Sequence, residues 1–227
     1  MKSLLLYIGI ALIVVSCAHN TYSVETGDLL FQVNKSSNLA NAITAVTSSR
    51  DNLNFSHVAI VVVEKNNCYA LEAASEGGVR LTPLSDFLRS SAKIEGRPAV
   101  MVARLRANAP IRAAVERAKE YLNQPYDWSY LPHNGKMYCS ELVYESYRDS
   151  LGNPLFTARP MTFRNAHGET AAFWVAHFAS LGEPIPEGVM GTNPGDLSKE
   201  PTLEVVYRYY GEHKKHPSTS RQARAEE

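Results

Sequence analysis

Cys139 stands in the stretch YCSELVYESY, residues 138–147, where a cysteine could act as a nucleophile. The residues after it follow an amphipathic helical pattern, so Cys139 is expected at the N-terminal end of a helix. The free N–H groups and the dipole at such an end favour a thiolate over a thiol. A thiolate nucleophile also needs a base within reach and a third group that orients the base. Without these partners, Cys139 would be a small buried residue or half of a disulfide.

The best candidate for the base is His57, which opens the apolar run HVAIVVVE, residues 57–64. This run is rich in β-branched residues and predicts a central strand buried on both faces. A histidine at the start of such a strand is either an ordinary strand-end residue or a base that a rigid sheet positions. The strand alone leaves both interpretations open.

Glu72 supplies the candidate for the third group. It lies in CYALEAA, residues 68–74, where an unpaired charge among small and apolar side chains would be costly. If a turn near residue 66 joins this run to the strand of His57, residues whose numbers sum to about 131 or 132 lie opposite each other. His57 and Glu72 are then diagonal neighbours on one face, within reach of a hydrogen bond. A half-exposed strand carboxylate is the alternative interpretation of Glu72.

The elements that must position these residues give an α+β pattern, in which an antiparallel sheet packs against helices. Gly77 and Gly78 predict a second hairpin turn after the strand of Glu72, and the helix that begins at Cys139 is expected to stop before Gly152. The other predicted strands are 27–33, 98–105 and 203–210, and the other predicted helices are 37–49, the segment from Pro110 to Leu122, and 169–182. No internal repeat or linker divides the middle of the chain, so residues 24–210 are expected to form one domain.

The two ends of the chain are expected to lie outside this domain. Lys2 and the apolar run 4–15 are typical of an export signal, and VVSC, ending at Cys17, resembles the lipobox of bacterial lipoproteins. Residues 1–16 would then be a cleaved signal peptide, and a lipid on Cys17 would attach the protein to a membrane of the bacterial cell envelope. A plain cleaved signal, giving a secreted or periplasmic protein, and an uncleaved anchor are the alternatives. The polar tail 211–227 lacks periodicity and is expected to be disordered.

Composition argues against several other classes of function. Lys plus Arg and Asp plus Glu each total 23 of the 227 residues, so no basic excess points to nucleic acid as a partner. No CxxC or HExxH spacing occurs, so no metal site is predicted, and nothing in the sequence indicates a cofactor. A disulfide between Cys68 and Cys139 is disfavoured because a core of this size needs no covalent staple. The oligomeric state stays open.

Five segments carry a resemblance to a known family: GDLLF (27–31), SHVAIV (56–61), LEA (71–73), YDWSY (126–130) and YCSELVYESY (138–147). Together with weaker matches up to residue 200, they resemble the YiiX/YebB-like group, the circularly permuted papain-like members of the NlpC/P60 cysteine hydrolases. In that group the histidine precedes the cysteine, as His57 precedes Cys139 here. The resemblance implies a circularly permuted papain-like fold with Cys139 as nucleophile, His57 as base and acid, and Glu72 as the residue that orients His57.

The resemblance also implies a cell-envelope amidase or peptidase that cleaves amide bonds in cell-wall peptides or related N-acyl or γ-glutamyl substrates, through a thioester on the cysteine. A lipid acyltransferase or acyl hydrolase of the lecithin:retinol acyltransferase type and a non-catalytic envelope binding module are the alternatives. Tyr126 and Tyr138 flank the expected cleft and are candidates for substrate binding, although both could be plain core or rim aromatics. His133 lies six residues before Cys139 and could line the same cleft or be an ordinary loop residue.

Overall fold

The structure is a computed structural model that describes residues 22–65, 67–106 and 110–211. The predicted signal peptide 1–16, the predicted lipidation site Cys17 and the predicted tail beyond residue 211 lie outside the described residues. Within the described ranges, no helix is long and apolar enough to cross a membrane. Cys68 and Cys139 are both free thiols.

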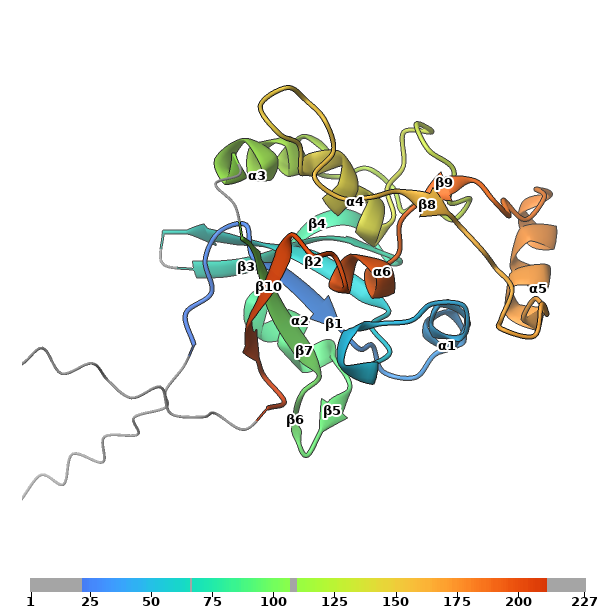
Figure 1. Ribbon diagram of the computed structural model, residues 1–227, viewed down its shortest axis with the longest axis horizontal. Coiled ribbons are helices and arrows are strands. Elements are labelled where there is room, and N and C mark those ends of the chain that lie inside the picture. The colour runs from blue at the N-terminus through green and yellow to red at the C-terminus, as the bar shows by residue number, and fades with distance from the viewer. Residues whose placement is uncertain (1–21, 66, 107–109, 212–227) are drawn as a thin grey trace, which may run out of the picture.

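A six-stranded antiparallel sheet forms the centre of the α+β fold, with the strand order β10-β7-β1-β2-β3-β4 (Figure 1). The two predicted hairpins join β2 to β3 and β3 to β4, which gives the expected antiparallel meander. The strands are β1 (Leu29–Gln32), β2 (His57–Glu64), β3 (Asn67–Ala74), β4 (Gly78–Pro83), β7 (Val100–Leu105) and β10 (Leu203–Arg208). β1 and β2 lie in the middle of the sheet, so each of them pairs with a neighbouring strand on both edges.

Helices pack around the central sheet, and two short ribbons form separate two-stranded sheets (Figure 1). The helices are α1 (Asn38–Ala45), α2 (Leu84–Ser90), α3 (Ile111–Glu120), α4 (Cys139–Ser146), α5 (Ala172–Leu181) and α6 (Pro194–Ser198), with a 3-10 turn at Arg50–Asn52. Two short ribbons pair β5 (Lys93–Ile94) with β6 (Arg97–Pro98) and β8 (Arg159–Pro160) with β9 (Met190–Gly191). The sequence patterns do not predict α2, α6 or these ribbons, because each of them is too short to show a clear periodicity.

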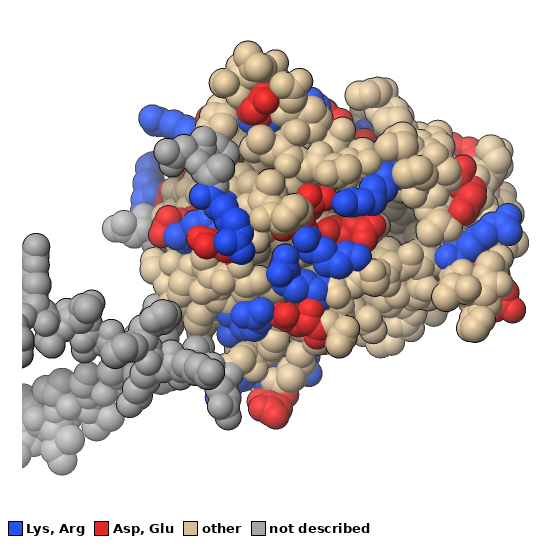
Figure 2. All heavy atoms as spheres, viewed as in Figure 1, with Lys and Arg blue, Asp and Glu red and all other residues tan. Residues whose placement is uncertain are grey.

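The alternation of side chains along β2 divides the core between the two faces of the sheet. Val58, Ile60 and Val62 pack with apolar residues of α3 and α4 on one face. Ala59 and Val61 pack on the other face, together with Phe87 of α2. Both faces are therefore buried, as the continuous apolar run of β2 predicts. On the surface that Figure 2 shows, Lys and Arg side chains are interspersed with Asp and Glu side chains.

The helix that begins at Cys139 ends at Ser146, so the prediction that it runs until Gly152 is wrong. Tyr147 leaves the helix with extended backbone (φ −91°, ψ 96°), and its hydroxyl donates a buried hydrogen bond of 2.8 Å to the carbonyl of Gly27. Its own carbonyl accepts from the N–H of Leu155. These long-range contacts end the helix before the chain reaches Gly152.

Candidate active site

His57 and Glu72 meet in the β2–β3 hairpin as the sequence predicts. Val61 pairs with Ala70, so the numbers of opposite residues sum to 131. The Nε2 atom of His57 lies 2.6 Å from Oε2 of Glu72, and both side chains are buried. The predicted diagonal contact is therefore confirmed.

The second oxygen of the Glu72 carboxylate is held from β4. Oε1 accepts hydrogen bonds from the Thr82 hydroxyl at 2.5 Å and from Nε of Arg80 at 3.2 Å. Burial alone would raise the pKa of Glu72, but the hydrogen bond and charge of His57, followed by Thr82 and Arg80, lower it to about 2. Glu72 is thus an ionised carboxylate fixed on both oxygens.

Arg80 and Thr82 are site residues that the sequence reasoning missed. Arg80 is the cross-strand partner of Glu72 in the β3–β4 hairpin. The sequence contains a signal for Arg80. A hairpin turn that ends at Gly78 places a residue near 80 opposite Glu72, by the same counting of paired residues that places His57 near Glu72.

His57 lies between the carboxylate of Glu72 and the thiol of Cys139. Burial alone would lower the pKa of His57, but hydrogen bonds to Cys139 and Glu72 and the negative charge of both partners raise it to about 10. Since Nε2 contacts Glu72, the other ring nitrogen is left for the cysteine. The ring also packs against Phe87 of α2, with centroids 5.9 Å apart. His57 is therefore held as an imidazolium in a fixed orientation.

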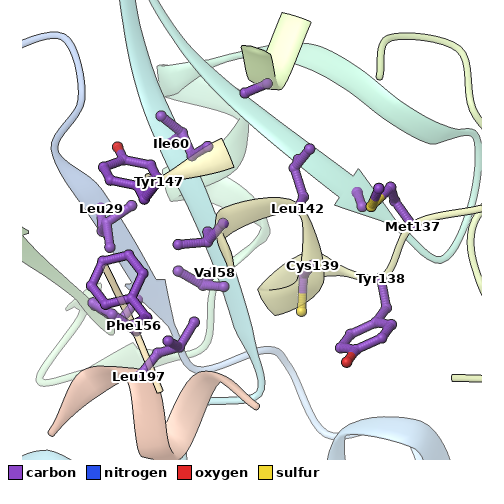
Figure 3. Packing of buried hydrophobic residues seen from close by; sticks show 14 of the residues in the cluster. Leu29, Val58, Ile60, Met137, Tyr138, Cys139, Leu142, Tyr147, Phe156 and Leu197 are labelled. Atoms are coloured by element: carbon purple, nitrogen blue, oxygen red, sulfur yellow. The ribbon is translucent and has the colours of Figure 1, made fainter. Parts of the chain in front are cut away.

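Cys139 is the first residue of α4 and is 5% exposed. Figure 3 shows its sulfur at the start of the helix, on the cluster that also contains Val58 and Leu142. The Tyr138 N–H donates to Oε2 of Glu141 at 3.4 Å, which closes the first turn as in a capping box. Burial and the charge of Asp127 raise the pKa of Glu141 to about 8. The first N–H groups of a helix have no partner within the helix, so Cys139, as the first residue of α4, lies where such groups can face an anion.

A second contact fixes the start of α4 from a distant segment. The Ser140 hydroxyl donates to the carbonyl of Thr192 at 3.0 Å, within the buried interior. Thr192 directly follows the β8–β9 ribbon. The ribbon is thereby tied to the residue next to Cys139.

A cavity of about 110 Å³ opens beside Cys139. Its wall is mainly apolar and aromatic, with contributions from the end of α1, the loop before α4, the β8–β9 ribbon and α5. The aromatic side chains in the wall are Tyr126, Tyr130, Tyr138, Phe163 and Trp174. Several of these rings contact one another edge to face, which makes the wall rigid.

Tyr126 and Tyr138, two predicted substrate-binding residues, both line this cavity. Burial raises the pKa of Tyr126 well above its ordinary value, and the neighbouring Tyr130 and Cys139 act in the same direction. Burial likewise raises the pKa of Tyr138, whose hydroxyl accepts a hydrogen bond from the Thr192 N–H at 3.3 Å. Both tyrosines are therefore neutral hydrogen-bond donors at the wall of the cavity.

His133 does not reach the cavity beside Cys139, so the prediction that it lines this cleft is not supported. It is exposed, has a left-handed backbone (φ 59°), and borders two neighbouring hollows together with Glu141. The cause is Asp127, whose carboxylate accepts hydrogen bonds of 2.9 Å from the N–H groups of Ser129 and Leu131 and from the Asn134 side chain. These bonds fold the loop so that its tyrosines face inward and His133 faces outward.

The sequence reasoning also missed several cavity residues, among them Tyr130, Met161, Phe163, Trp174 and Thr192. Tyr130 lies in the segment YDWSY, residues 126–130, where no spacing rule distinguishes it from Tyr126. The others belong to residues 161–192, which return to the site through contacts between distant segments, such as the pairing of β8 with β9 and the hydrogen bond from Ser140 to Thr192. No local pattern in the sequence predicts that these residues lie beside Cys139.

Comparisons with known proteins agree with this geometry. A family model described as the permuted papain-like amidase enzymes, YaeF/YiiX, C92 family, matches residues 23–207. The uncharacterized protein YiiX of Escherichia coli strain K12 is 30% identical over 155 residues, which cover 67% of this chain and 70% of YiiX. A crystal structure described as metalloprotein yiiX from Escherichia coli O157:H7 superposes with a TM-score of 0.68 at 25% identity, covering 84% of this chain and 100% of that one. The fold is thus the permuted papain-like fold, and the chain belongs to the YaeF/YiiX family of permuted papain-like amidases.

Proposed function

We propose that the protein is a cysteine hydrolase that cleaves amide bonds through a thioester intermediate, with Cys139, His57 and Glu72 as its catalytic triad. The observation that carries the proposal is the buried chain of contacts from Cys139 to His57 to Glu72. A thiolate beside an imidazolium that a fixed carboxylate orients is the arrangement of an activated cysteine nucleophile. The amidase family of the chain supports the same reaction type.

In the proposed reaction, the thiol proton of Cys139 passes to His57, and the thiolate Sγ attacks the carbonyl carbon of the substrate, so that the carbonyl oxygen becomes an oxyanion. His57 then gives its proton to the departing amine nitrogen as the C–N bond breaks, which leaves a thioester on Cys139. A water molecule attacks the thioester, His57 takes its proton, and the carboxylic acid leaves. The Cys139 N–H at the start of α4 and the neutral hydroxyl of Tyr126 are the donors proposed for the oxyanion.

The proposed mechanism uses no metal ion. The crystal structure of yiiX is described as that of a metalloprotein. In residues 22–211 as described for this chain, no group of three or more His, Cys, Asp or Glu side chains is placed to hold a metal ion together.

Two substrate classes are proposed for the site. Amide bonds of cell-wall peptides suit an amidase of the cell envelope, which follows from the family and from the predicted export of the chain. The second class is apolar acyl groups, and one observation favours it: the wall beside Cys139 is built mainly from aromatic and aliphatic side chains. An apolar group of the substrate would be desolvated there at little cost.

A substrate panel tests the proposal. The protein is incubated with peptidoglycan fragments, with N-acyl amides of increasing acyl length, and with acyl lipid esters, and the products are analysed by mass spectrometry. We expect release of an amine from at least one amide class and an acyl adduct on Cys139 after acid quenching. Cleavage confined to lipid esters would contradict the amidase proposal, as would an adduct on any other residue.

We further propose that a lipid on Cys17 holds the protein at a membrane of the bacterial cell envelope. The support is the sequence pattern of an apolar run followed by VVSC. In a bacterial host, Cys17→Ser is expected to move the protein from the membrane fraction to the soluble fraction. Unchanged fractionation of this variant would contradict lipidation.

A further inference from the structure

Two charged side chains stand in the otherwise uncharged wall of the cavity beside Cys139. They are Arg159 and Asp196. A charge at the edge of an apolar site orients a substrate that carries the opposite charge. The hydrogen bonds of these two residues therefore bear on which substrates the site accepts.

Asp196 already has its partners within the protein. Its carboxylate lies 2.8 Å from Nζ of Lys199 and accepts a hydrogen bond of 2.8 Å from the Asn193 side chain. Its backbone N–H donates to Oδ1 of Asn193, which caps α6. Asp196 is therefore neutralised and occupied by the start of its own helix.

Arg159 is held at one end and open at the other. Its Nη1 donates to Oε1 of Glu200 at 3.1 Å, the single hydrogen bond that the described residues show for this side chain. The Glu200 side chain is 5% exposed, whereas the Arg159 side chain is 51% exposed. A guanidinium has several N–H donors in a planar fork, so most of the Arg159 donors stay available.

The backbone of Arg159 is fixed relative to the nucleophile. Arg159 pairs with Gly191 in the β8–β9 ribbon. The next residue, Thr192, accepts the hydrogen bond from Ser140, the neighbour of Cys139. The ribbon thus holds a pre-oriented arginine at the wall of the cavity that contains the thiol.

We propose that Arg159 is a specificity-determining residue that binds a carboxylate of the substrate. The preferred substrates would be N-acyl amides with an apolar part for the aromatic wall and a free carboxylate for Arg159. A carboxylate matches the guanidinium fork with two parallel hydrogen bonds. The buried Glu200 carboxylate orients the arginine from one side and leaves its exposed side open. This inference rests on the proposed amide hydrolysis and names its substrate class.

Ligand binding to the Cys139→Ala protein tests the inference without requiring turnover. The probes are N-decanoylglycine, which has a carboxylate, and N-decanoylglycinamide, its neutral counterpart, measured by calorimetry at low salt. We expect the carboxylate ligand to bind about tenfold more tightly, the size of one charge-assisted hydrogen-bonded contact. Arg159→Gln in the same background should remove this preference. Arg164→Gln, a change of an arginine outside the cavity wall, should keep it.

Equal affinities for the two probes in the Cys139→Ala protein, absence of binding by both, or a preference that survives Arg159→Gln would each overturn the inference. Arg159→Lys separates loss of the guanidinium from misfolding of the variant. It keeps the positive charge and should keep a weaker preference for the carboxylate ligand. Turnover of the same two amides by the protein with Cys139 intact separates the two proposals. If neither these amides nor any amide of the substrate panel is cleaved while the preference depends on Arg159, the hydrolase proposal fails and the binding site stands.

Discussion

Replacement of Cys139 by alanine is expected to reduce amide hydrolysis by about 10⁴-fold or more, close to the uncatalysed background. The thiol of Cys139 forms the proposed thioester, whereas the other two members of the triad, His57 and Glu72, act on it through protons and charge. Without the thiol, neither residue has a nucleophile to activate. The measurement is kcat/KM on the amide identified by the substrate panel, together with mass spectrometry for loss of the acyl adduct.

The matched control is Cys68→Ala in β3. Cys68 is the other free cysteine of the described chain, and it is packed beside the core cluster on the opposite face of the sheet, near Tyr209. Its replacement should leave hydrolysis unchanged. The Cys139→Ala protein should keep the thermal stability of the parent to within a few degrees, since a small apolar residue replaces a small buried one. Hydrolysis that persists in this folded variant would remove Cys139 from the mechanism.

The part of the site that the sequence could predict is the part held by short-range geometry. The β2–β3 hairpin has a tight turn, so counting residues was enough to place Glu72 beside His57. The start of α4 was visible because an amphipathic pattern begins directly after Cys139. The approach of Cys139 to His57, by contrast, depended on the resemblance to a known family, because no local rule packs α4 against β2.

The rest of the site is fixed by contacts between distant segments, which one sequence does not reveal. The β8–β9 ribbon contains only two residues in each strand and depends on the hydrogen bond between Ser140 and Thr192 for its position. The same ribbon brings Arg159 to the cavity wall. The early end of α4 at Tyr147 has the same kind of cause, a buried hydrogen bond to Gly27. Patterns with a period of two or 3.6 residues carry no information about such contacts.

Glu72→Gln is expected to lower kcat by about 10²-fold or more while KM changes little. The glutamine side chain is neutral and cannot stabilise the His57 imidazolium. Its NH₂ group can also turn toward the ring nitrogen of His57, which needs a hydrogen-bond acceptor. KM should hold because Glu72 does not line the cavity beside Cys139. The control is Glu76→Gln, which makes the same change at an exposed carboxylate in the β3–β4 turn.

The same variant should reveal the charge of Glu72 in the pH dependence of stability. The folded state lowers the pKa of Glu72 from 4.5 to about 2, so its stabilising contribution is complete above pH 4.5 and disappears as the pH falls toward 2. The size of this contribution is about 3 kcal/mol in the free energy of unfolding. For His57, whose pKa rises from 6.5 to about 10, the contribution is complete below pH 6.5 and disappears as the pH rises through 10. Both shifts describe one ion pair and are not added together.

Urea unfolding of the parent and the Glu72→Gln protein between pH 2 and 10 measures this difference directly. The gap between the two unfolding free energies should be widest between about pH 4.5 and 6.5, and it should narrow on both sides of that window. Effects of other carboxylates are common to both proteins and cancel in the gap. A gap that stays constant down to pH 2 would mean that Glu72 is not charged against His57. The glutamine would then act only through lost packing, and the orienting role proposed for Glu72 would fail even if kcat fell.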